Sequence, residues 1–245
     1  MTAIVLAAGE SKRMGGGTPK VLRLLGNRPL LAHVIDSCRA AGATRIIVVV
    51  GAAQDTIRAR FANQGLEFAV QSEPKGTADA VLACRDVVRP EEECVVVYGD
   101  VPLMTGSSIC RLIETRRQTQ ADVAVLTAVL DNPCGYGRVV RGAGGTIERI
   151  VEERDADEVT RRVREVNSGF YAFVWGRIRP ALERVRPSPV SGEYYLTDAI
   201  ALVRADGGKV VAVPMDDPCE MLGANTPEQL TAIERIWAAR LAAAR

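Results

Sequence analysis

The stretch Ile4-Val-Leu-Ala-Ala-Gly9 decides how the fold of this 245-residue chain is interpreted. The apolar residues Ile4 to Leu6 predict the end of a buried strand. Ala7, Ala8 and Gly9 then carry small side chains where the strand passes into a loop, so a flat or anionic ligand can approach the backbone N–H groups closely. This order of strand, small residues and loop indicates a ligand site at the end of a strand.

The loop after Gly9 is rich in glycine, and its cations include Arg13 and Lys20, seven residues apart. Its glycines make it pliable, and Pro19 disfavours a helix through it. Two positive side chains beside a pliable backbone suit a polyphosphate. The loop matches neither the G-x-x-x-x-G-K-[ST] nor the G-x-G-x-x-G pattern, so any nucleotide would be held by a different kind of loop. An ordinary glycine turn between a strand and a helix is the alternative.

The bulk composition is that of an ordinary globular protein and limits its partners. Apolar residues make up 47% of the chain and charged residues 25%, which suits one α/β domain of this length. With 31 basic and 30 acidic residues the net charge is +1, which gives no electrostatic footprint for nucleic acid or a membrane. The six cysteines form no C-x-x-C pair, and the N-terminus lacks the features of a signal peptide. We therefore expect buried thiols and a cytoplasmic protein.

Hydrophobic patterns along the chain alternate between strands and helices. We expect strands at 46–50, 67–70, 94–98, 122–129, 163–174 and 209–213, and a hairpin formed by 135–140 and 147–151. We expect helices at 29–41, 55–62, 77–85, 109–119, 175–184, 195–205 and 227–244, the last one capped by Thr226 before Pro227. The fold class is therefore α/β, a Rossmann-like, doubly wound, mostly parallel sheet in a single domain with a small β elaboration in its second half.

Asp100 directly follows the apolar run 94–98. Ligands of open α/β sheets bind where the strands end, so a carboxylate there, beside a triphosphate, is a natural ligand for Mg²⁺. A turn or a helix cap is the more common role of such an aspartate. Both readings fit the flanking residues Gly99 and Pro102.

Gln71 follows another expected strand and precedes Gly76 and Thr77. An amide side chain together with a backbone N–H group can read the edge of a pyrimidine base. Because the amide can flip, Gln71 alone does not separate uracil from cytosine, and the Gly76 backbone would have to fix the choice. A polar loop in which Thr77 begins a helix is the alternative.

Glu152, Asn167 and Asn225 each lie at the end or edge of an apolar run, where caps and turns also place such residues. His33 is the sole histidine and lies within a helical pattern, so a structural role is expected and a histidine base is not. No G-x-S-x-G motif and no metal-spaced histidine pair occurs, which argues against acyl transfer and zinc chemistry.

Together these segments and several others form a series of motifs that runs through nearly the whole chain. They are Leu6-Ala-Ala-Gly9, Arg13-Met14, Pro19-Lys20-Val21-Leu22, Gln71 with Gly76-Thr77, Tyr98-Gly-Asp-Val-Pro-Leu103, Pro133 with Gly135-Tyr-Gly-Arg138, Ile150-Val-Glu152, Val166-Asn-Ser-Gly169, Gly192-Glu-Tyr-Tyr-Leu-Thr-Asp198 and Gly223-Ala-Asn225. In content and order they resemble the uridylyltransferase half of the bacterial bifunctional N-acetylglucosamine-1-phosphate uridylyltransferase/glucosamine-1-phosphate acetyltransferases.

The resemblance implies the nucleotide-diphospho-sugar transferase fold, the substrates UTP and N-acetylglucosamine 1-phosphate, and Mg²⁺ as cofactor. Residues 1–130 would mainly bind the nucleotide, residues 131–225 mainly the sugar, and residues 226–245 would form a C-terminal helix. The implied nucleotide contacts are Leu6, Ala7, Ala8, Gly9, Gln71, Gly76, Thr77, Tyr98, Gly99 and Asp100. The implied sugar contacts are Gly137, Glu152, Asn167 and Asn225, with Arg13 and Lys20 as catalytic cations and Asp100 and Asn225 as metal ligands.

This chain departs from the family pattern at three places. Ala78-Asp79 stands where the family usually has Gly-His, so contacts near the base or ribose are expected to differ, and Ser168 replaces a threonine. The chain ends at Arg245 without the hexapeptide repeats of the acetyltransferase half, so that activity and its trimer are not expected. Three alternatives stay open: another sugar 1-phosphate, dTTP or CTP in place of UTP, or a non-catalytic domain that binds a UDP-sugar.

Overall fold

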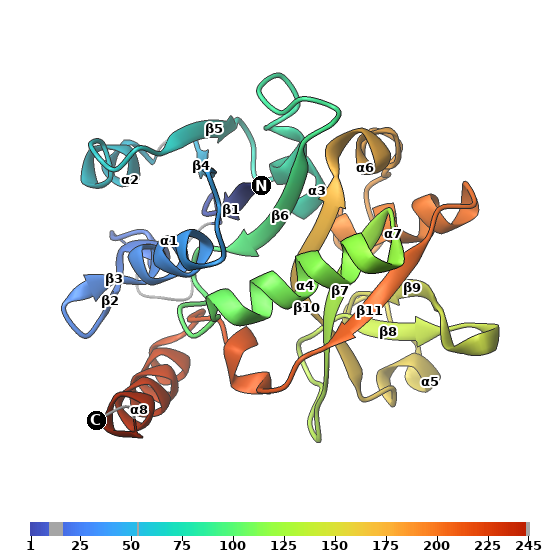
Figure 1. Cartoon of the computed structure of the whole chain (residues 1–245). Coiled ribbons are helices and arrows are strands. Elements are labelled where there is room, and N and C mark those ends of the chain that lie inside the picture. Colours follow the sequence, from blue (N-terminus) through green and yellow to red (C-terminus); the bar gives the residue numbers. More distant parts are fainter. Residues whose placement is uncertain (10–16, 53, 244–245) are drawn as a thin grey trace.

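The computed structural model describes residues 1–9, 17–52 and 54–243. Within these residues, a nine-stranded mixed sheet forms the centre of the molecule, and its main path runs in the order β11-β7-β10-β6-β1-β4-β5 (Figure 1). The strands of this path are β1 (Thr2–Leu6), β4 (Arg45–Gly51), β5 (Glu67–Gln71), β6 (Glu93–Tyr98), β7 (Val123–Val129), β10 (Glu165–Val174) and β11 (Val210–Pro214). Neighbours on the path are parallel except at β10, which is antiparallel to both β6 and β7. The expected mostly parallel α/β sheet is confirmed.

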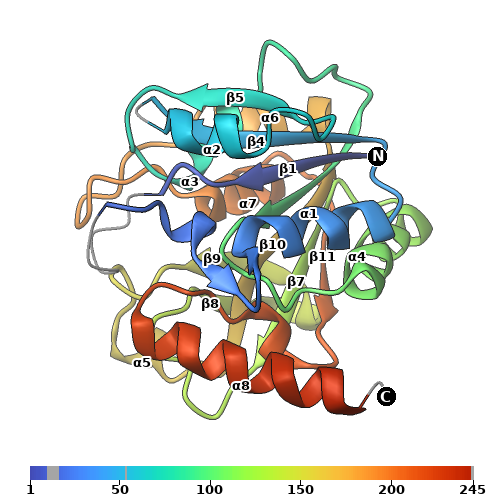
Figure 2. The same ribbon diagram turned by 90° about the vertical axis from the view of Figure 1, so that its left-hand side faces the viewer.

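Helices cover both faces of this sheet (Figures 1 and 2). One face carries α1 (Leu30–Ala40), α2 (Asp55–Arg60) and α4 (Gly106–Thr119), and the other carries α3 (Thr77–Leu82), α6 (Trp175–Leu182) and α7 (Leu196–Ala205). Successive side chains of a strand point to opposite faces. In β1, Ala3 and Val5 therefore belong to the first core and Ile4 and Leu6 to the second. Two buried layers explain why the strand sequences are almost continuously apolar.

The expected hairpin is formed by β8 (Arg138–Arg141) and β9 (Ile147–Val151), with the short helix η3 (Ala143–Gly145) at its tip. It joins the main sheet where Arg138 pairs with Val166 of β10. The short helix α5 (Glu158–Arg161) follows it. The hairpin therefore extends the sheet beside the first residues of β10.

The C-terminal helix α8 (Pro227–Ala243) packs on a small two-stranded sheet, β2 (Leu24–Leu25) with β3 (Arg28–Pro29), which the sequence patterns did not predict. Gly26 lies in the turn between these strands with φ +59°, and a Cβ there would lie 2.6 Å from Trp237 of α8. Two-residue strands are too short to show alternation. Two further short helices, η2 (Lys20–Leu22) and η4 (Pro218–Met221), lie on the connections near α8.

Thr226, His33 and the cysteines occupy well-defined local environments. The hydroxyl of Thr226 accepts a hydrogen bond from the Gln229 N–H (3.3 Å), which confirms the predicted helix cap. His33 Nε2 lies 3.0 Å from the carbonyl oxygen of Leu25 and its ring packs edge-on against Trp237, a structural role. Cys38, Cys84 and Cys94 are buried as expected, but Cys134 is exposed on a loop. None of the described helices is long and apolar enough to cross a lipid bilayer.

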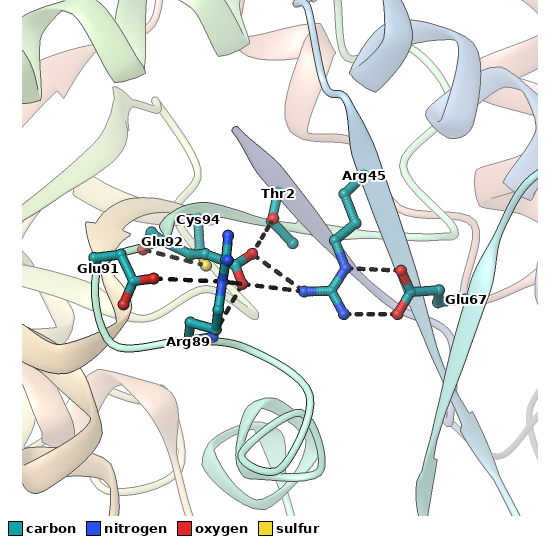
Figure 3. Close-up of polar contacts among 7 residues, drawn as sticks. All are labelled: Thr2, Arg45, Glu67, Arg89, Glu91, Glu92 and Cys94. Atoms are coloured by element: carbon teal, nitrogen blue, oxygen red, sulfur yellow. Dashed lines mark hydrogen bonds and ion pairs between the residues drawn. The ribbon is translucent and has the colours of Figure 1, made fainter.

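An ion-pair network joins the amino ends of the parallel strands (Figure 3). Arg45, the first residue of β4, binds both carboxylate oxygens of Glu67 at 2.7 Å and those of Glu92 at 3.1 and 3.2 Å. Glu92 also accepts hydrogen bonds from the Thr2 hydroxyl at 2.7 Å and from the Arg89 side chain at 3.1 Å. Burial alone would raise the pKa of Glu92, but these hydrogen bonds outweigh it and lower the pKa to about 2.

We predict that Glu92→Gln lowers the free energy of unfolding by roughly 1.5–3 kcal/mol at pH 7, because charge-assisted hydrogen bonds are lost. A carboxylate with a depressed pKa stabilises the fold above its unfolded-state pKa, and this contribution disappears as the pH falls through the folded-state value. The difference between wild type and variant should therefore shrink between pH 4.5 and 2. Urea unfolding over this pH range tests it, with Glu91→Gln, 69% exposed, as the matched control. A difference that stays constant with pH would contradict the prediction.

Candidate functional site

The carboxyl ends of β1, β4, β5 and β6 lie at one edge of the sheet because these strands are parallel. Since β10 runs the opposite way, its first residues lie at the same edge. Two neighbouring cavities open along this edge, of about 440 Å³ and about 370 Å³. The site expected from the sequence therefore lies where strands from both halves of the chain meet.

The larger cavity, called here the Gln71 cavity, lies over the ends of β1 and β5 and the start of α3. Its lining is partly apolar and partly polar. The residues are Leu6, Ala8, Gly9, Lys20, Gln71, Pro74, Gly76, Thr77, Ala80, Tyr98, Asp100 and Glu193. Most of the nucleotide contacts implied by the resemblance are thus brought together around one space.

The smaller cavity, called here the Glu152 cavity, lies between the β8–β9 hairpin, the start of β10 and the segment before α8. It is the more polar of the two. Its lining is Lys20, Tyr98, Asp100, Val101, Cys134, Gly135, Tyr136, Gly137, Glu152, Asn167, Ser168, Gly169, Met221, Gly223, Asn225 and Gln229. All four residues implied as sugar contacts line it.

Lys20, Tyr98 and Asp100 line both cavities and mark where they meet. The Lys20 ammonium group donates to the Asp100 Oδ2 at 2.6 Å and to the Asn225 Oδ1 at 2.9 Å. The Ala224 N–H in turn donates to the Asp100 carbonyl oxygen at 3.0 Å, which fixes the segment before α8 against the end of β6. Residues from the first loop, the centre of the sheet and the C-terminal segment therefore converge on one positive charge.

The donor set at this junction is suitable for a divalent cation. The carboxylate oxygen of Asp100 and the amide oxygen of Asn225 already face the same positive group, Lys20 Nζ. Mg²⁺ prefers oxygen ligands and is commonly held by one or two protein oxygens together with substrate phosphates and water. The oxygens of Asp100 and Asn225 fit that requirement.

A bulge in β10 shapes the wall between the two cavities. Its pairing with β7 is irregular between Asn167 and Tyr171, and Gly169 within the bulge has φ +85°. A Cβ on Gly169 would lie 2.3 Å from the ring of Tyr98. The left-handed backbone and the close ring contact both require glycine. Gly169 thereby lets the Tyr98 ring lie close to the backbone of β10 at the junction of the cavities.

The side chain of Asn167 is held in one orientation by the same bulge. Its Oδ1 accepts from the Gly169 N–H at 3.0 Å, and its Nδ2 donates to the Tyr171 hydroxyl at 2.6 Å. Its backbone N–H donates to the Gly137 carbonyl oxygen at 2.8 Å. Gly137 itself is close to Glu152, because a Cβ there would lie 3.4 Å from the Glu152 Oε2. Three of the implied sugar contacts thus form one connected wall.

The loop before α3 is supported by a segment from the second half of the chain. Gly76 has φ +124°, and a Cβ there would lie 2.4 Å from the carbonyl oxygen of Tyr194. The Tyr194 N–H donates to the Lys75 carbonyl oxygen at 2.7 Å, and the Ala78 N–H donates to the Tyr194 carbonyl oxygen at 2.9 Å. Any side chain at 76 would displace this backbone contact. The segment around Tyr194 therefore fixes the wall of the Gln71 cavity at the start of α3.

Glu152 is a partly buried acid next to other acids. Its Oε1 accepts from the Thr197 hydroxyl at 2.9 Å. Burial raises the pKa of Glu152, the hydrogen bond from Thr197 opposes that rise, and the nearby carboxylates Asp198, Asp155 and Glu193 add to it. The pKa of Asp198 is raised too, by burial and by Asp155. The Glu152 cavity therefore carries an acid whose charge is costly at neutral pH.

Two of the expected nucleotide contacts, Ala7 and Gly99, lie outside the cavity walls. Ala7 is buried and donates its N–H to the Val49 carbonyl oxygen at 2.8 Å, while the Gly99 N–H donates to the Leu6 carbonyl oxygen at 2.9 Å. Both lie beneath the surface and line neither cavity. Small residues at these positions allow close strand packing instead. Arg13 lies outside the described residues.

Other lining residues had no separate role in the sequence interpretation. These are Pro74, Ala80, Val101, Cys134, Gly135, Tyr136, Ser168, Gly169, Glu193, Met221, Gly223 and Gln229. Glu193, Gly169 and Gly223 lie inside the family motifs 192–198, 166–169 and 223–225, so their closeness in sequence to predicted site residues could have indicated them. No sequence pattern indicated Met221 or Gln229, because only the path of the chain around η4 and the start of α8 brings them to the Glu152 cavity.

A family model described as the MobA-like NTP transferase domain matches residues 3–167. The chain belongs to this family of NTP transferases. It is 42% identical to the bifunctional protein GlmU of Heliobacterium modesticaldum over 241 residues, which cover 98% of this chain and 52% of the relative. It is 41% identical to the bifunctional protein GlmU of Paraburkholderia phymatum over 236 residues, 96% of this chain and 52% of the relative.

The chain thus spans about half the length of these curated relatives. Their similarity confirms the resemblance that the motifs indicated. Among solved structures, a UDP-glucose pyrophosphorylase complexed with UDP-glucose superposes on this NTP transferase with a TM-score of 0.79 at 15% identity, covering 98% of both chains. A putative glucose-1-phosphate thymidylyltransferase from Bacillus anthracis gives 0.78 at 20% identity, covering 96% of this chain and 94% of the other. At such identities these structures establish the shared fold.

We predict that Glu152→Gln stabilises the protein by about 1 kcal/mol at pH 7, because an amide keeps the acceptor for Thr197 and removes a partly buried charge. An acid whose pKa is raised in the folded state makes the protein less stable as the pH rises through the unfolded-state pKa and the folded-state pKa. The advantage of the variant should therefore be small at pH 4.5 and grow above it. Thermal unfolding from pH 4.5 to 8 measures this, with exposed Glu148→Gln as control. A variant less stable than wild type at pH 7 would contradict it.

Proposed function

We propose that this chain transfers a uridylyl group from UTP to N-acetylglucosamine 1-phosphate, which gives UDP-N-acetylglucosamine and pyrophosphate. The observation that carries the proposal is the junction of two cavities at Lys20, Asp100 and Asn225. A nucleotidyl transfer needs two phosphorylated substrates whose phosphates meet at one positively charged place. The two cavities meet at such a place.

Each cavity suits one substrate. In the Gln71 cavity, small and apolar residues such as Leu6 and Ala8 can receive a flat base, and Gln71 supplies an amide at its wall. In the Glu152 cavity, Glu152 and Asn167 offer the polar groups that a sugar ring requires. The nucleoside triphosphate would occupy the first and the sugar phosphate the second, with their phosphates beside Lys20.

The reaction needs no protein base. A sugar 1-phosphate is already largely dianionic at neutral pH, since its second pKa is about 6. Its oxygen attacks the α-phosphorus of UTP, a P–O bond forms, and the bond to the departing pyrophosphate breaks. The barrier comes from bringing two anions together and from the charge that develops on the leaving group. Lys20 meets this need as a positive charge at the junction.

Asp100 and Asn225 would hold Mg²⁺ in this site. When bound, the ion neutralises phosphate charge and helps to orient the two substrates. The carboxylate of Asp100 and the amide of Asn225 also keep the Lys20 ammonium group at the junction before substrates bind. The end of β6 and the segment before α8 thus position the cation in advance.

The similarity to the bifunctional protein GlmU supports the choice of UTP and N-acetylglucosamine 1-phosphate. A steady-state assay of pyrophosphate release tests that choice. The protein with Mg²⁺ is given UTP, dTTP or CTP, each combined with N-acetylglucosamine 1-phosphate or glucose 1-phosphate. We expect the highest kcat/KM with UTP and the N-acetylated sugar. A higher kcat/KM for another pair would show that the substrates are that pair instead. UDP-sugar binding without turnover would indicate a non-catalytic domain.

We predict that Lys20→Ala lowers kcat by roughly 100-fold or more, the scale of a lost charge-stabilising group in an active site. Lys209→Ala is the matched control, because this exposed lysine donates to the Thr119 carbonyl oxygen away from both cavities. Near-normal turnover of Lys20→Ala in the same assay would refute the role of Lys20.

A further inference from the structure

The amide of Gln71 is held in one orientation by two acceptors. Its Nε2 donates to the Gly76 carbonyl oxygen at 3.0 Å and to the Asp79 Oδ2 at 2.9 Å. The residue is only 6% exposed, so water has little access to the group. A primary amide has two N–H donors, and these two bonds use both of them.

The chemistry of the two partners decides which end of the amide faces them. A flipped amide would place its oxygen against a carbonyl oxygen and a carboxylate oxygen, and neither of these can donate a hydrogen bond. The flip that usually leaves glutamine ambiguous is therefore excluded here. Oε1 is the end left over, and within the described part of the chain no residue donates a hydrogen bond to it.

Asp79 contacts Gln71 but does not line the Gln71 cavity. It belongs to the first turn of α3 and lines a separate hollow of about 170 Å³, together with Gln71 and Asp86. Gln71 lines this hollow as well as the Gln71 cavity, whereas Asp79 does not line that cavity. Gln71 thus borders both spaces, and one of its two N–H donors is directed to an acceptor, Asp79, that borders the hollow and not the cavity.

We propose that Asp79 is a positioning residue that selects the nucleobase, by making Gln71 present only an acceptor to the cavity. Uracil and thymine carry an N3–H donor that can bond to Oε1. Cytosine has an unprotonated N3 at the same place, whose lone pair Oε1 would repel. The inference rests on the proposed function in placing the base of a nucleoside triphosphate in the Gln71 cavity. It assigns base selection to a residue that does not itself touch the base.

Equilibrium binding of UDP and CDP, measured by calorimetry on the full chain, tests the role of Asp79 without requiring turnover. The wild type should bind UDP at least about tenfold more tightly than CDP. Asp79→Ala should lower this ratio severalfold, because one of the two acceptors that fix the amide is lost and only the Gly76 carbonyl oxygen still opposes a flip. Asp79→Asn should largely keep the ratio, since its Oδ1 can still accept from Gln71 Nε2.

Asp86→Ala is the matched control, because it removes a carboxylate from the same hollow without touching Gln71, and Asp86 is 87% exposed. It should leave the ratio unchanged. If thermal unfolding shows that Asp79→Ala is not folded, Asp79→Leu is used in its place. The leucine side chain fills the space but offers no hydrogen-bond acceptor. A wild-type ratio near one, or a folded Asp79→Ala or Asp79→Leu with the wild-type ratio, would overturn the proposal.

The two proposals fail in distinguishable ways. If the protein turns over UTP but its ratio of UDP to CDP affinity is the same in the Asp79 variants, the proposed reaction stands and the role of Asp79 is refuted. If Asp79 controls the preference for UDP but no sugar 1-phosphate gives pyrophosphate release, the role of Asp79 stands and the proposed reaction is refuted. The ratio of kcat/KM for UTP to kcat/KM for CTP in the variants adds a second readout. A purely structural loss would lower kcat/KM for both nucleotides alike and leave this ratio unchanged.

Discussion

The contact of the Lys20 ammonium group with Asp100 and Asn225 is the interaction on which the whole site depends. It joins the loop after β1, the end of β6 and the segment before α8. Lys20 is 19% exposed and Asp100 only 6%, so the pair is shielded from bulk water and weakly screened by salt. A charge held there lies at the boundary of both cavities, which is where negatively charged groups of two substrates would have to approach each other.

The rest of the architecture keeps that meeting point open. Parallel strands bring the first half of the chain to one edge of the sheet, and the antiparallel strand β10 brings the second half to the same edge. Two backbone features then shape the walls. The bulge at Gly169 admits the ring of Tyr98, and the turn at Gly76 admits the backbone of Tyr194. In both cases a residue from one half of the chain fits only because the other half has no side chain there.

Much of this could be predicted from the sequence, for identifiable reasons. Continuous apolar runs such as 46–50 marked buried strands, and residues that follow such strands, such as Gln71 and Asp100, were rightly placed at one edge of a sheet. Other features depend on long-range contacts that local patterns do not encode. The backbone N–H groups of Ala7 and Gly99, two predicted nucleotide contacts, are bonded to neighbouring strands, a pairing that local patterns do not encode. The orientation of the Gln71 amide could not be predicted, because it depends on the relation of Asp79 to the end of β5.

The most direct test of the central claim is a crystal structure of the protein with UDP-N-acetylglucosamine and Mg²⁺. We expect the uracil ring in the Gln71 cavity, the sugar in the Glu152 cavity, and the diphosphate between them beside Lys20, Asp100 and Asn225. A ligand bound anywhere else, or a diphosphate that lies away from these three residues, would contradict the account.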